Sequence, residues 1–278
     1  MSGILYIVAT PIGNLEDITL RAIRILKEVD IIAAEDTRHT LKLLNHLEIT
    51  KPMISYHRHN EEIKTDELIH QLLEGKNIAL VSDAGTPVIS DPGEEIVKVA
   101  LEQDIKVTPI PGPCALITAL IASGIDAKEF AFLGFLPLNK KNRKEKLIQI
   151  EKQEITSILY EAPHKLMQTL EDLVDITKQR KIVLARELTK IHEECIYGTA
   201  EELLNKIKEP KGEYVIIIEK NEKTEIQEEK EMLSKLTFEE HYHYYEKIGL
   251  NKKEIIKQIA KDRNVNKNEI YQKFINKA

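Results

Sequence analysis

The feature that most constrains the fold is a regular alternation of short apolar runs with amphipathic segments. Apolar runs at residues 4–9, 31–34, 78–81 and 105–110 have the length of buried strands. Segments 19–29, 62–73 and 96–101, which separate them, repeat apolar residues at helical spacing. Alternation of this kind predicts a mostly parallel sheet with helices on both faces.

A second series of the same kind begins after the chain break Pro111-Gly112-Pro113. Strands are expected at residues 130–134, 156–160, 181–186, 193–197 and 214–219, and helices at 115–122, 143–153, 165–176 and 200–207. The sequence therefore predicts an α/β protein with an N-terminal domain at 1–112 and a C-terminal domain at 113–221. A charged linker and a small helical tail are expected over 222–278, where Ile255, Ile256 and Ile259 share one face and Ile270, Tyr271, Phe274 and Ile275 share another.

Composition excludes several classes of protein. The formal net charge of −6 over 278 residues means that a nucleic acid must be bound by a local basic patch. Cys114 and Cys195 have no zinc spacing, and the close histidine pairs lack further ligands, so we expect no metal site and no disulfide. No apolar run approaches the roughly 20 residues that span a bilayer, and no leader pattern is seen, so a soluble cytoplasmic protein is expected.

Three polar, glycine-containing loops follow predicted strands, at the sheet edge where α/β proteins bind ligands. They are TPIGNL at residues 10–15, SDAGTP at 82–87 and PGPCA at 111–115. Glycine lets the backbone approach a ligand, and a carboxylate such as Asp83 can attract a cation. Each loop alone also fits an ordinary turn or a helix cap. The glycine-rich dinucleotide fingerprint and the P-loop are both absent, which argues against dehydrogenases and P-loop NTPases.

Taken together, seven motifs in order resemble the tetrapyrrole methylase superfamily, and within it the branch that methylates ribosomal RNA. Besides the three loops they are AEDTR at 34–38, YEAPHKL at 160–166, ARELTK at 185–190 and GEYV at 212–215. The resemblance implies two α/β domains with S-adenosylmethionine in the cleft between them. It also implies 2′-O-methylation of a cytidine ribose in 16S rRNA of the small ribosomal subunit, and a homodimer.

The resemblance carries cofactor-binding roles onto specific positions. The implied residues are Pro11, Gly13, Asp83, Gly85, Thr86, Gly112, Pro113, Tyr160, Glu161 and Ala162. One local departure is the segment SYHRHN at 55–60, where Arg58 stands in place of an expected acidic residue.

Candidates for catalysis lie in and beside ARELTK. A ribose hydroxyl needs a base, or a cation that stabilises the developing alkoxide. Glu187 and Glu194 are the candidate bases, and Lys190 and Arg186 are the candidate partners of an alkoxide or a phosphate. The alternative is a solvated ion-pair cluster at a strand end.

Two basic stretches suit contact with RNA phosphates. The first contains the predicted RNA-binding residues Lys140, Lys141, Arg143 and Lys144, in what we expect to be a basic loop leading into a helix. The second, residues 247–278, holds nine basic and three acidic residues, which gives +6. A solvated helix face is the alternative for each.

The sequence is also compatible with two other functions. One is methylation of a tetrapyrrole or precorrin, or of another small substrate, on the same fold. The other is an inactive RNA-binding assembly factor. The basic stretches favour RNA over a small acidic macrocycle, and the complete TPIGNL and SDAGTP loops favour an active enzyme.

Overall fold

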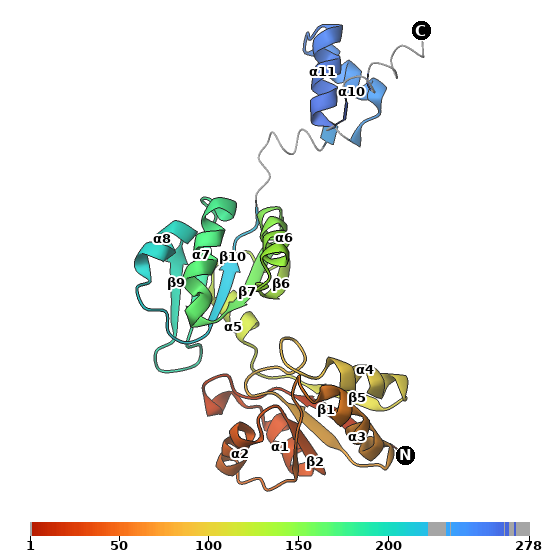
Figure 1. Cartoon of the computed structure of the whole chain (residues 1–278), viewed down its shortest axis with the longest axis vertical. Helices are drawn as coiled ribbons and strands as arrows, with labels where there is room; N and C mark the ends of the chain where they lie inside the picture. Colours follow the sequence, from red (N-terminus) through yellow and green to blue (C-terminus); the bar gives the residue numbers. More distant parts are fainter. Residues whose placement is uncertain (1, 222–231, 234, 264, 267–269, 271–278) are drawn as a thin grey trace. The chain divides into compact units, whose positions relative to one another are not determined.

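The computed structural model describes residues 2–221, 232–233, 235–263, 265–266 and 270, and it divides into two compact units, Met1–Lys220 and Asn221–Ala278 (Figure 1). The first unit holds both α/β series, and the second is a small helical unit. The predicted linker lies largely outside the described residues. No helix among the described residues is long and apolar enough to cross a bilayer.

The first sheet is parallel throughout. Its strands are β1 (Ile4–Val8), β2 (Ile31–Ala34), β3 (Met53–Ser55), β4 (Ile78–Val81) and β5 (Lys106–Ile110), in the spatial order β3-β2-β4-β1-β5. All four residues of β2 and of β4 are buried, as expected for central strands covered on both faces. Because the strands are parallel, the loops after them gather at one edge.

Helices cover both faces of this sheet. Apolar residues of α1 (Leu20–Glu28) and α2 (Thr37–His46) form one core cluster with Val8, Ile32 and Val81. Those of α3 (Glu61–Leu73) and α4 (Glu94–Glu102) form another with Leu5 and Leu80. Side chains alternate between the two faces of each strand, so the sheet contributes residues to two separate hydrophobic cores. A 3-10 turn, η1 (Leu15–Asp17), leads into α1.

The second sheet is mixed. Its strands are β6 (Phe130–Phe135), β7 (Thr156–Glu161), β8 (Ile182–Arg186), β9 (Glu194–Gly198) and β10 (Tyr214–Ile218), in the order β6-β7-β10-β8-β9. β6 and β7 are parallel, whereas β10 runs antiparallel to both β7 and β8, and β9 is antiparallel to β8. The amino end of β10 therefore lies beside the carboxyl ends of β7 and β8.

Helices also sandwich the second sheet. α5 (Ala115–Ala122) packs on one face, where Leu116 and Leu120 meet Val183 and Ile217. α6 (Lys140–Glu151), α7 (Pro163–Thr177) and α8 (Ala200–Lys206) cover the other face. α5 follows β5 after four residues and already belongs to the second sheet's core. The boundary predicted at residue 112 falls in this short connection.

The helical unit has its own apolar core. α10 (Phe238–Lys247) and α11 (Lys252–Asp262) each begin at a capping box, and the core cluster includes Leu233, Tyr245, Ile256 and Ile259. The turn between them lies at 248–251, and Ile270 is also buried in this core. Tyr271, Phe274 and Ile275 of the predicted second face lie outside the described residues.

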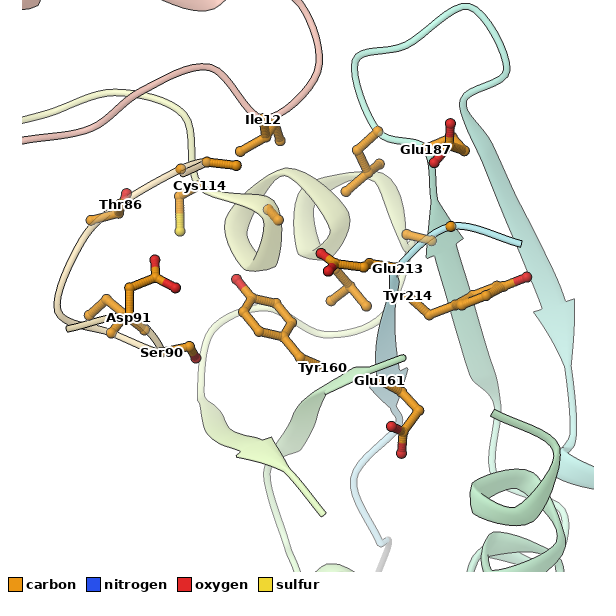
Figure 2. Close-up of a pocket in the computed structure, with 18 of the residues that line it drawn as sticks. Ile12, Thr86, Ser90, Asp91, Cys114, Tyr160, Glu161, Glu187, Glu213 and Tyr214 are labelled. Atoms are coloured by element: carbon orange, nitrogen blue, oxygen red, sulfur yellow. The ribbon is translucent and has the colours of Figure 1, made fainter. Parts of the chain in front are cut away.

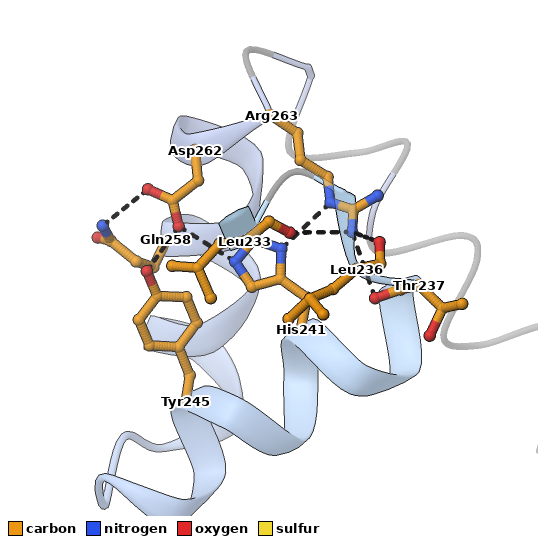
Figure 3. Close-up of polar contacts among 8 residues, drawn as sticks. All are labelled: Leu233, Leu236, Thr237, His241, Tyr245, Gln258, Asp262 and Arg263. Carbon is orange, nitrogen blue, oxygen red and sulfur yellow. Dashed lines mark hydrogen bonds and ion pairs between the residues drawn. The ribbon is translucent and has the colours of Figure 1, made fainter. Parts of the chain in front are cut away.

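A buried polar network joins the two helices of this unit (Figure 3). The side chain of Asp262 accepts hydrogen bonds from Tyr245 (2.6 Å) and Gln258 (3.1 Å), and lies 3.3 Å from Nε2 of His241. Nε of Arg263 donates to Nδ1 of His241 at 3.1 Å, and the guanidinium also binds the carbonyls of Leu233, Leu236 and Thr237. These contacts fix how α10 and α11 pack.

Candidate active site

A cavity of about 390 Å³ in the first unit lies among loops from both sheets (Figure 2). The first sheet contributes the loops after β1, β4 and β5, and the second sheet contributes the ends of β6, β7 and β8 and the start of β10. A cavity of this size is within the usual range for small-molecule sites. The residues that line it are Ile12, Ala84, Gly85, Thr86, Ile89, Ser90, Asp91, Cys114, Ala115, Phe135, Tyr160, Glu161, Ala185, Glu187, Leu188, Lys190, Gly212, Glu213, Tyr214 and Val215.

Backbone hydrogen bonds tie the predicted loops of the first sheet together. Thr10 and Gly85 exchange two of them, with N–O distances of 2.9 and 3.0 Å. The Thr86 hydroxyl donates to the carbonyl of Pro113 at 3.0 Å, which links the second loop to the third. Gly85 has a φ of +80°, in the left-handed region that favours glycine. The three loops therefore form one continuous wall.

The structure brings only some of the predicted cofactor residues to this cavity. Gly85, Thr86, Tyr160 and Glu161 line it. Pro11 and Asp83 instead line a smaller hollow of about 140 Å³, formed within the first sheet's loops and α2. The remaining predicted residues are in the connecting loops but are not among the lining residues; they are Gly13, Gly112, Pro113 and Ala162.

Asp83 has a clear local role. Its Oδ1 accepts the backbone N–H of Asp36 at 3.0 Å, and Asp36 in turn caps α2 by accepting from the N–H of Arg38 at 2.8 Å. The carboxylate of Asp83 therefore joins the loop after β4 to the loop after β2. Both AEDTR and SDAGTP take part in this contact.

Two predicted glycines lie where backbone and side chains approach closely. A Cβ on Gly13 would stand 2.6 Å from Cγ of Lys190, and a Cβ on Gly112 would stand 2.9 Å from Cβ of Ala9. Gly13 comes from the loop after β1, while Lys190 comes from the loop after β8. The absence of a side chain at Gly13 thus lets the loops of the two sheets touch.

The ARELTK loop contributes an ion pair to the cavity wall. Nζ of Lys190 lies 3.0 Å from Oε1 of Glu187, and both residues line the cavity. Glu187 and Thr189 both adopt positive φ, at 50° and 67°, which is unusual for residues other than glycine. A loop held in such a conformation marks a candidate functional segment.

Arg186 and Glu194 are placed differently. The Arg186 guanidinium pairs with Glu194 at 2.5 and 2.8 Å across β8 and β9, and neither residue lines the cavity. Arg186 also donates to the hydroxyl of Tyr214 at 3.3 Å. Of the predicted catalytic residues, Glu187 and Lys190 are brought to the cavity and Arg186 is engaged beside it.

Glu161 belongs to a buried network behind the cavity wall. Its carboxylate accepts from the hydroxyl of Thr169 (2.6 Å) and from the N–H of Ala162 (2.9 Å). Thr169 also accepts from Arg143 (2.9 Å), which forms an ion pair of 2.6 Å with Asp172. Glu161 is 2% exposed, and these hydrogen bonds satisfy its buried carboxylate.

The same network alters the interpretation of the basic stretch at 140–146. These residues begin helix α6 and do not form a loop, which corrects the sequence prediction. Lys140, Lys141 and Lys144 are exposed on α6, whereas Arg143 is 11% exposed and anchors α6 to α7 through Asp172. The exposed positive charge of this helix thus comes from the three lysines.

Sequence reasoning did not single out three side chains of the cavity: Asp91, Glu213 and Tyr214. Asp91 lies after β4 in the turn Ser90-Asp91-Pro92-Gly93. This turn resembles the start of SDAGTP, so the sequence did contain a signal for Asp91. Glu213 precedes a strand, whereas the predicted ligand loops follow strands. The GEYV motif contains Glu213, but the resemblance assigned it no role. The antiparallel direction of β10 brings Glu213 to the same edge as the ends of β7 and β8.

Burial and neighbouring charges perturb two groups of the cavity. Burial raises the pKa of Asp91, with smaller contributions in the same direction from Asp83 and Glu213. Burial likewise raises the pKa of Tyr160 to about 12, and the charges of Asp91 and Glu213 add to this effect. The cavity therefore disfavours added negative charge and favours a cation.

Arg58 lies close to this acidic region. Its guanidinium donates to the carbonyl of Ser90, and its charge opposes the rise in the pKa of Asp91 and of the half-buried Glu35. Arg58, which stands where an acidic residue was expected, thus places a positive charge on the turn that carries Asp91. Within the described residues no group of three or more His, Cys, Asp or Glu is arranged to hold a metal ion.

Comparisons with known proteins agree with the fold and the motifs. The family model described as Tetrapyrrole (Corrin/Porphyrin) Methylases matches residues 4–204. A protein named ribosomal RNA small subunit methyltransferase I from Halalkalibacterium halodurans is 50% identical, with 97% of this chain and 93% of that protein covered. One of the same name from Bacillus subtilis is 49% identical, with 98% and 94% covered.

Solved structures share the fold at low sequence identity. A diphthine synthase aligns with a TM-score of 0.62 and 16% identity, covering 82% of this chain and 94% of that one. A uroporphyrin-III C-methyltransferase from Thermus thermophilus, in complex with S-adenosylhomocysteine, aligns with a TM-score of 0.56 and 18% identity, covering 77% and 97%. From the family match and the close relatives together, the chain belongs to the tetrapyrrole methylase family, and within it to the ribosomal RNA small subunit methyltransferase I group.

Proposed function

We propose that this chain transfers the methyl group of S-adenosylmethionine to the ribose 2′-hydroxyl of a cytidine in 16S rRNA, as part of the small ribosomal subunit. The observation that carries the proposal is an acidic cavity walled by loops of both sheets, in a chain about half identical to proteins named for methylation of this RNA.

The lining residues suit S-adenosylmethionine. Four acidic residues and one basic residue, Lys190, line the cavity, which gives a formal charge of 1 − 4 = −3. The cofactor carries a sulfonium and an ammonium against a single carboxylate, so its net charge is complementary. When bound, it supplies an electrophilic methyl group. Residues proposed to hold it from within the cavity are Gly85, Thr86 and Tyr160. Glu161 supports this wall through its hydrogen bonds with Thr169 and Ala162. The loops around them are shaped by Pro11, Gly13, Asp83, Gly112, Pro113 and Ala162.

Lys190 is the proposed cation of the reaction. Its side chain is 46% exposed, so the ammonium can meet a developing alkoxide or an RNA phosphate at the cavity wall. Glu187 positions that ammonium through their 3.0 Å contact. Arg186 is proposed to act as a supporting residue, because its ion pair with Glu194 joins β8 to β9 next to the ARELTK loop.

Helix α6 is the proposed RNA contact of the first unit. Lys140, Lys141 and Lys144 are exposed in its first turns, while Arg143 fixes the helix to α7. Lysines held on a rigid helix can neutralise phosphates without reading bases. We also propose a homodimer that acts in the cytoplasm, and light scattering of the purified chain tests the dimer.

One experiment separates the three functions left open by the sequence. The chain is incubated with methyl-labelled S-adenosylmethionine and either small ribosomal subunits lacking the modification or uroporphyrinogen. Label on a cytidine ribose supports the proposal. Label in the macrocycle replaces it with tetrapyrrole methylation, and no transfer to either, with RNA still bound, points to an assembly factor.

A further inference from the structure

Glu213 carries a carboxylate in the cavity that the proposed chemistry has not yet used. It belongs to the GEYV motif, lines the cavity and is exposed. Figure 2 shows its carboxylate directed toward the hydroxyl of Tyr160, with Asp91 on the other side. The mutual electrostatic influence of these three groups agrees with that view.

Glu213 differs from the other acids of the cavity in having no engaged partner. Glu187 is paired with Lys190, Glu161 accepts two hydrogen bonds, and the pKa of Asp91 is held down in part by Ser82 and by the positive charge of Arg58. Among the contacts that join the described residues, no hydrogen bond or ion pair involves the Glu213 side chain. Its accepting capacity is therefore available to a ligand.

The backbone on both sides of Glu213 is well fixed. Gly212 adopts a φ of +71°, and Tyr214 is 1% exposed at the start of β10. The Tyr214 hydroxyl accepts from Arg186 (3.3 Å) and from the N–H of Lys211 (3.3 Å), which closes the turn around residue 213. The carboxylate is thus presented from a rigid strand end, as a positioned catalytic group requires.

An exposed, unpaired carboxylate that lines a cavity meant to receive part of a polyanion weakens binding of that polyanion. A carboxylate that opposes RNA binding departs from the charge pattern expected of an RNA site, and such departures are typical of residues with a role in the reaction. From this position, and resting on the proposed function, we propose that Glu213 is the catalytic residue that accepts the proton of the ribose 2′-hydroxyl.

The step balances without any further reactant. The O–H bond of the ribose breaks and its proton passes to the carboxylate of Glu213. The oxygen electron pair forms the new bond to the methyl carbon, while the carbon–sulfur bond breaks and its electrons remain on sulfur. RNA that covers the cavity excludes water from the reacting atoms.

The test compares Glu213→Gln, Glu213→Asp and the control Glu209→Gln, which alters an exposed carboxylate four residues earlier. Single-turnover methyl transfer to small subunits is measured at saturating cofactor from pH 5 to 9. We expect Glu213→Gln to slow transfer about 100-fold or more and to lose the acid limb of the pH profile. Glu213→Asp should be intermediate, and Glu209→Gln should match the parent chain.

Binding measurements make the outcome decisive. Glu213→Gln removes one of the four carboxylates that line the cavity, so a small loss of cofactor affinity is expected by calorimetry, and transfer is therefore compared at saturating cofactor. The variant should bind RNA equally or more tightly, because a negative charge has been removed. Transfer within threefold of the parent overturns the inference, and so does a lost cofactor affinity with full transfer at saturation. If the parent chain itself transfers nothing, the proposed function fails instead.

Discussion

At the residue scale, Gly212 has two constraints that can be separated. Its φ of +71° disfavours any side chain, and a Cβ there would stand 2.4 Å from Oε1 of Glu187. Gly124 has a similar φ of +68° but nothing within 4 Å of its Cβ position. We expect both alanine variants to lower the free energy of unfolding by roughly 1–2 kcal/mol, the usual cost of the left-handed conformation.

Gly212→Ala should in addition lose methyl transfer, because Glu187 must move and release Lys190. Chemical unfolding and a transfer assay on both variants measure the two effects. Equal activity in the two variants would remove the Glu187–Lys190 pair from the proposed mechanism.

His241 makes the helical unit sensitive to acid. Burial, together with the positive charge of Arg263, holds the pKa of His241 below its ordinary value of 6.5, and Asp262 only partly offsets this. The unfolded chain therefore binds a proton more readily than the folded unit. Stability should be fully present above about pH 6.5 and should fall as the pH drops toward the lower folded pKa.

NMR titration of the histidine ring protons, with urea unfolding of the helical unit from pH 7.5 to 5, measures this dependence. His241→Gln should flatten it. His243→Gln is the control, since that side chain is 70% exposed two residues later. An unchanged slope in His241→Gln would assign the acid sensitivity to another group.

At the scale of elements, helix α6 is expected to contribute phosphate contacts through its lysines. The triple variant Lys140→Gln, Lys141→Gln, Lys144→Gln should weaken RNA binding and reduce the salt slope by about 2–3, since each phosphate contact contributes about 0.7–0.9. Cofactor affinity should not change. The matched control replaces three exposed lysines of the first sheet's half, Lys27, Lys98 and Lys106. A slope that falls equally in both variants would show a general charge effect.

The elements also show how far sequence reasoning reaches. Strands such as β2 and β4 were predictable because each is a short apolar run with all four residues buried. The three-residue β3 and the helix α2 (TRHTLKLLNH) were not predicted. β3 is too short for an alternating pattern to show, and α2 buries only Thr40 and Leu44. Strand direction in the second sheet was also out of reach, because hydrophobic patterning does not encode it.

The residues of the candidate site likewise divide into those that the sequence pattern predicted and those that it could not. Loops after parallel strands were found from sequence, and with them Gly85, Thr86 and Lys190 at the cavity. Glu213 was missed because β10 enters its sheet from the opposite direction. Arg143 was grouped with its lysine neighbours because sequence cannot show that its guanidinium turns toward Asp172.

At the scale of the whole molecule, the two units should have separable roles. Every residue that lines the cavity lies between 12 and 215, inside the first unit. A chain ending at Lys220 should therefore bind S-adenosylmethionine with the affinity of the full chain, measured by calorimetry. It should bind small subunits more weakly, because the exposed lysines of α11 are removed. A tenfold loss of cofactor affinity on truncation would contradict this separation.

The main-chain exchange between Thr10 and Gly85 has a consequence for how such proteins diversify. Peptide groups make these two bonds, so the shape they impose survives wholesale replacement of the neighbouring side chains. Lineages that inherit this scaffold are free to rewrite the surfaces that meet their acceptor molecule without rebuilding the frame. Solved structures at 16–20% identity share this fold, although few of their side chains match.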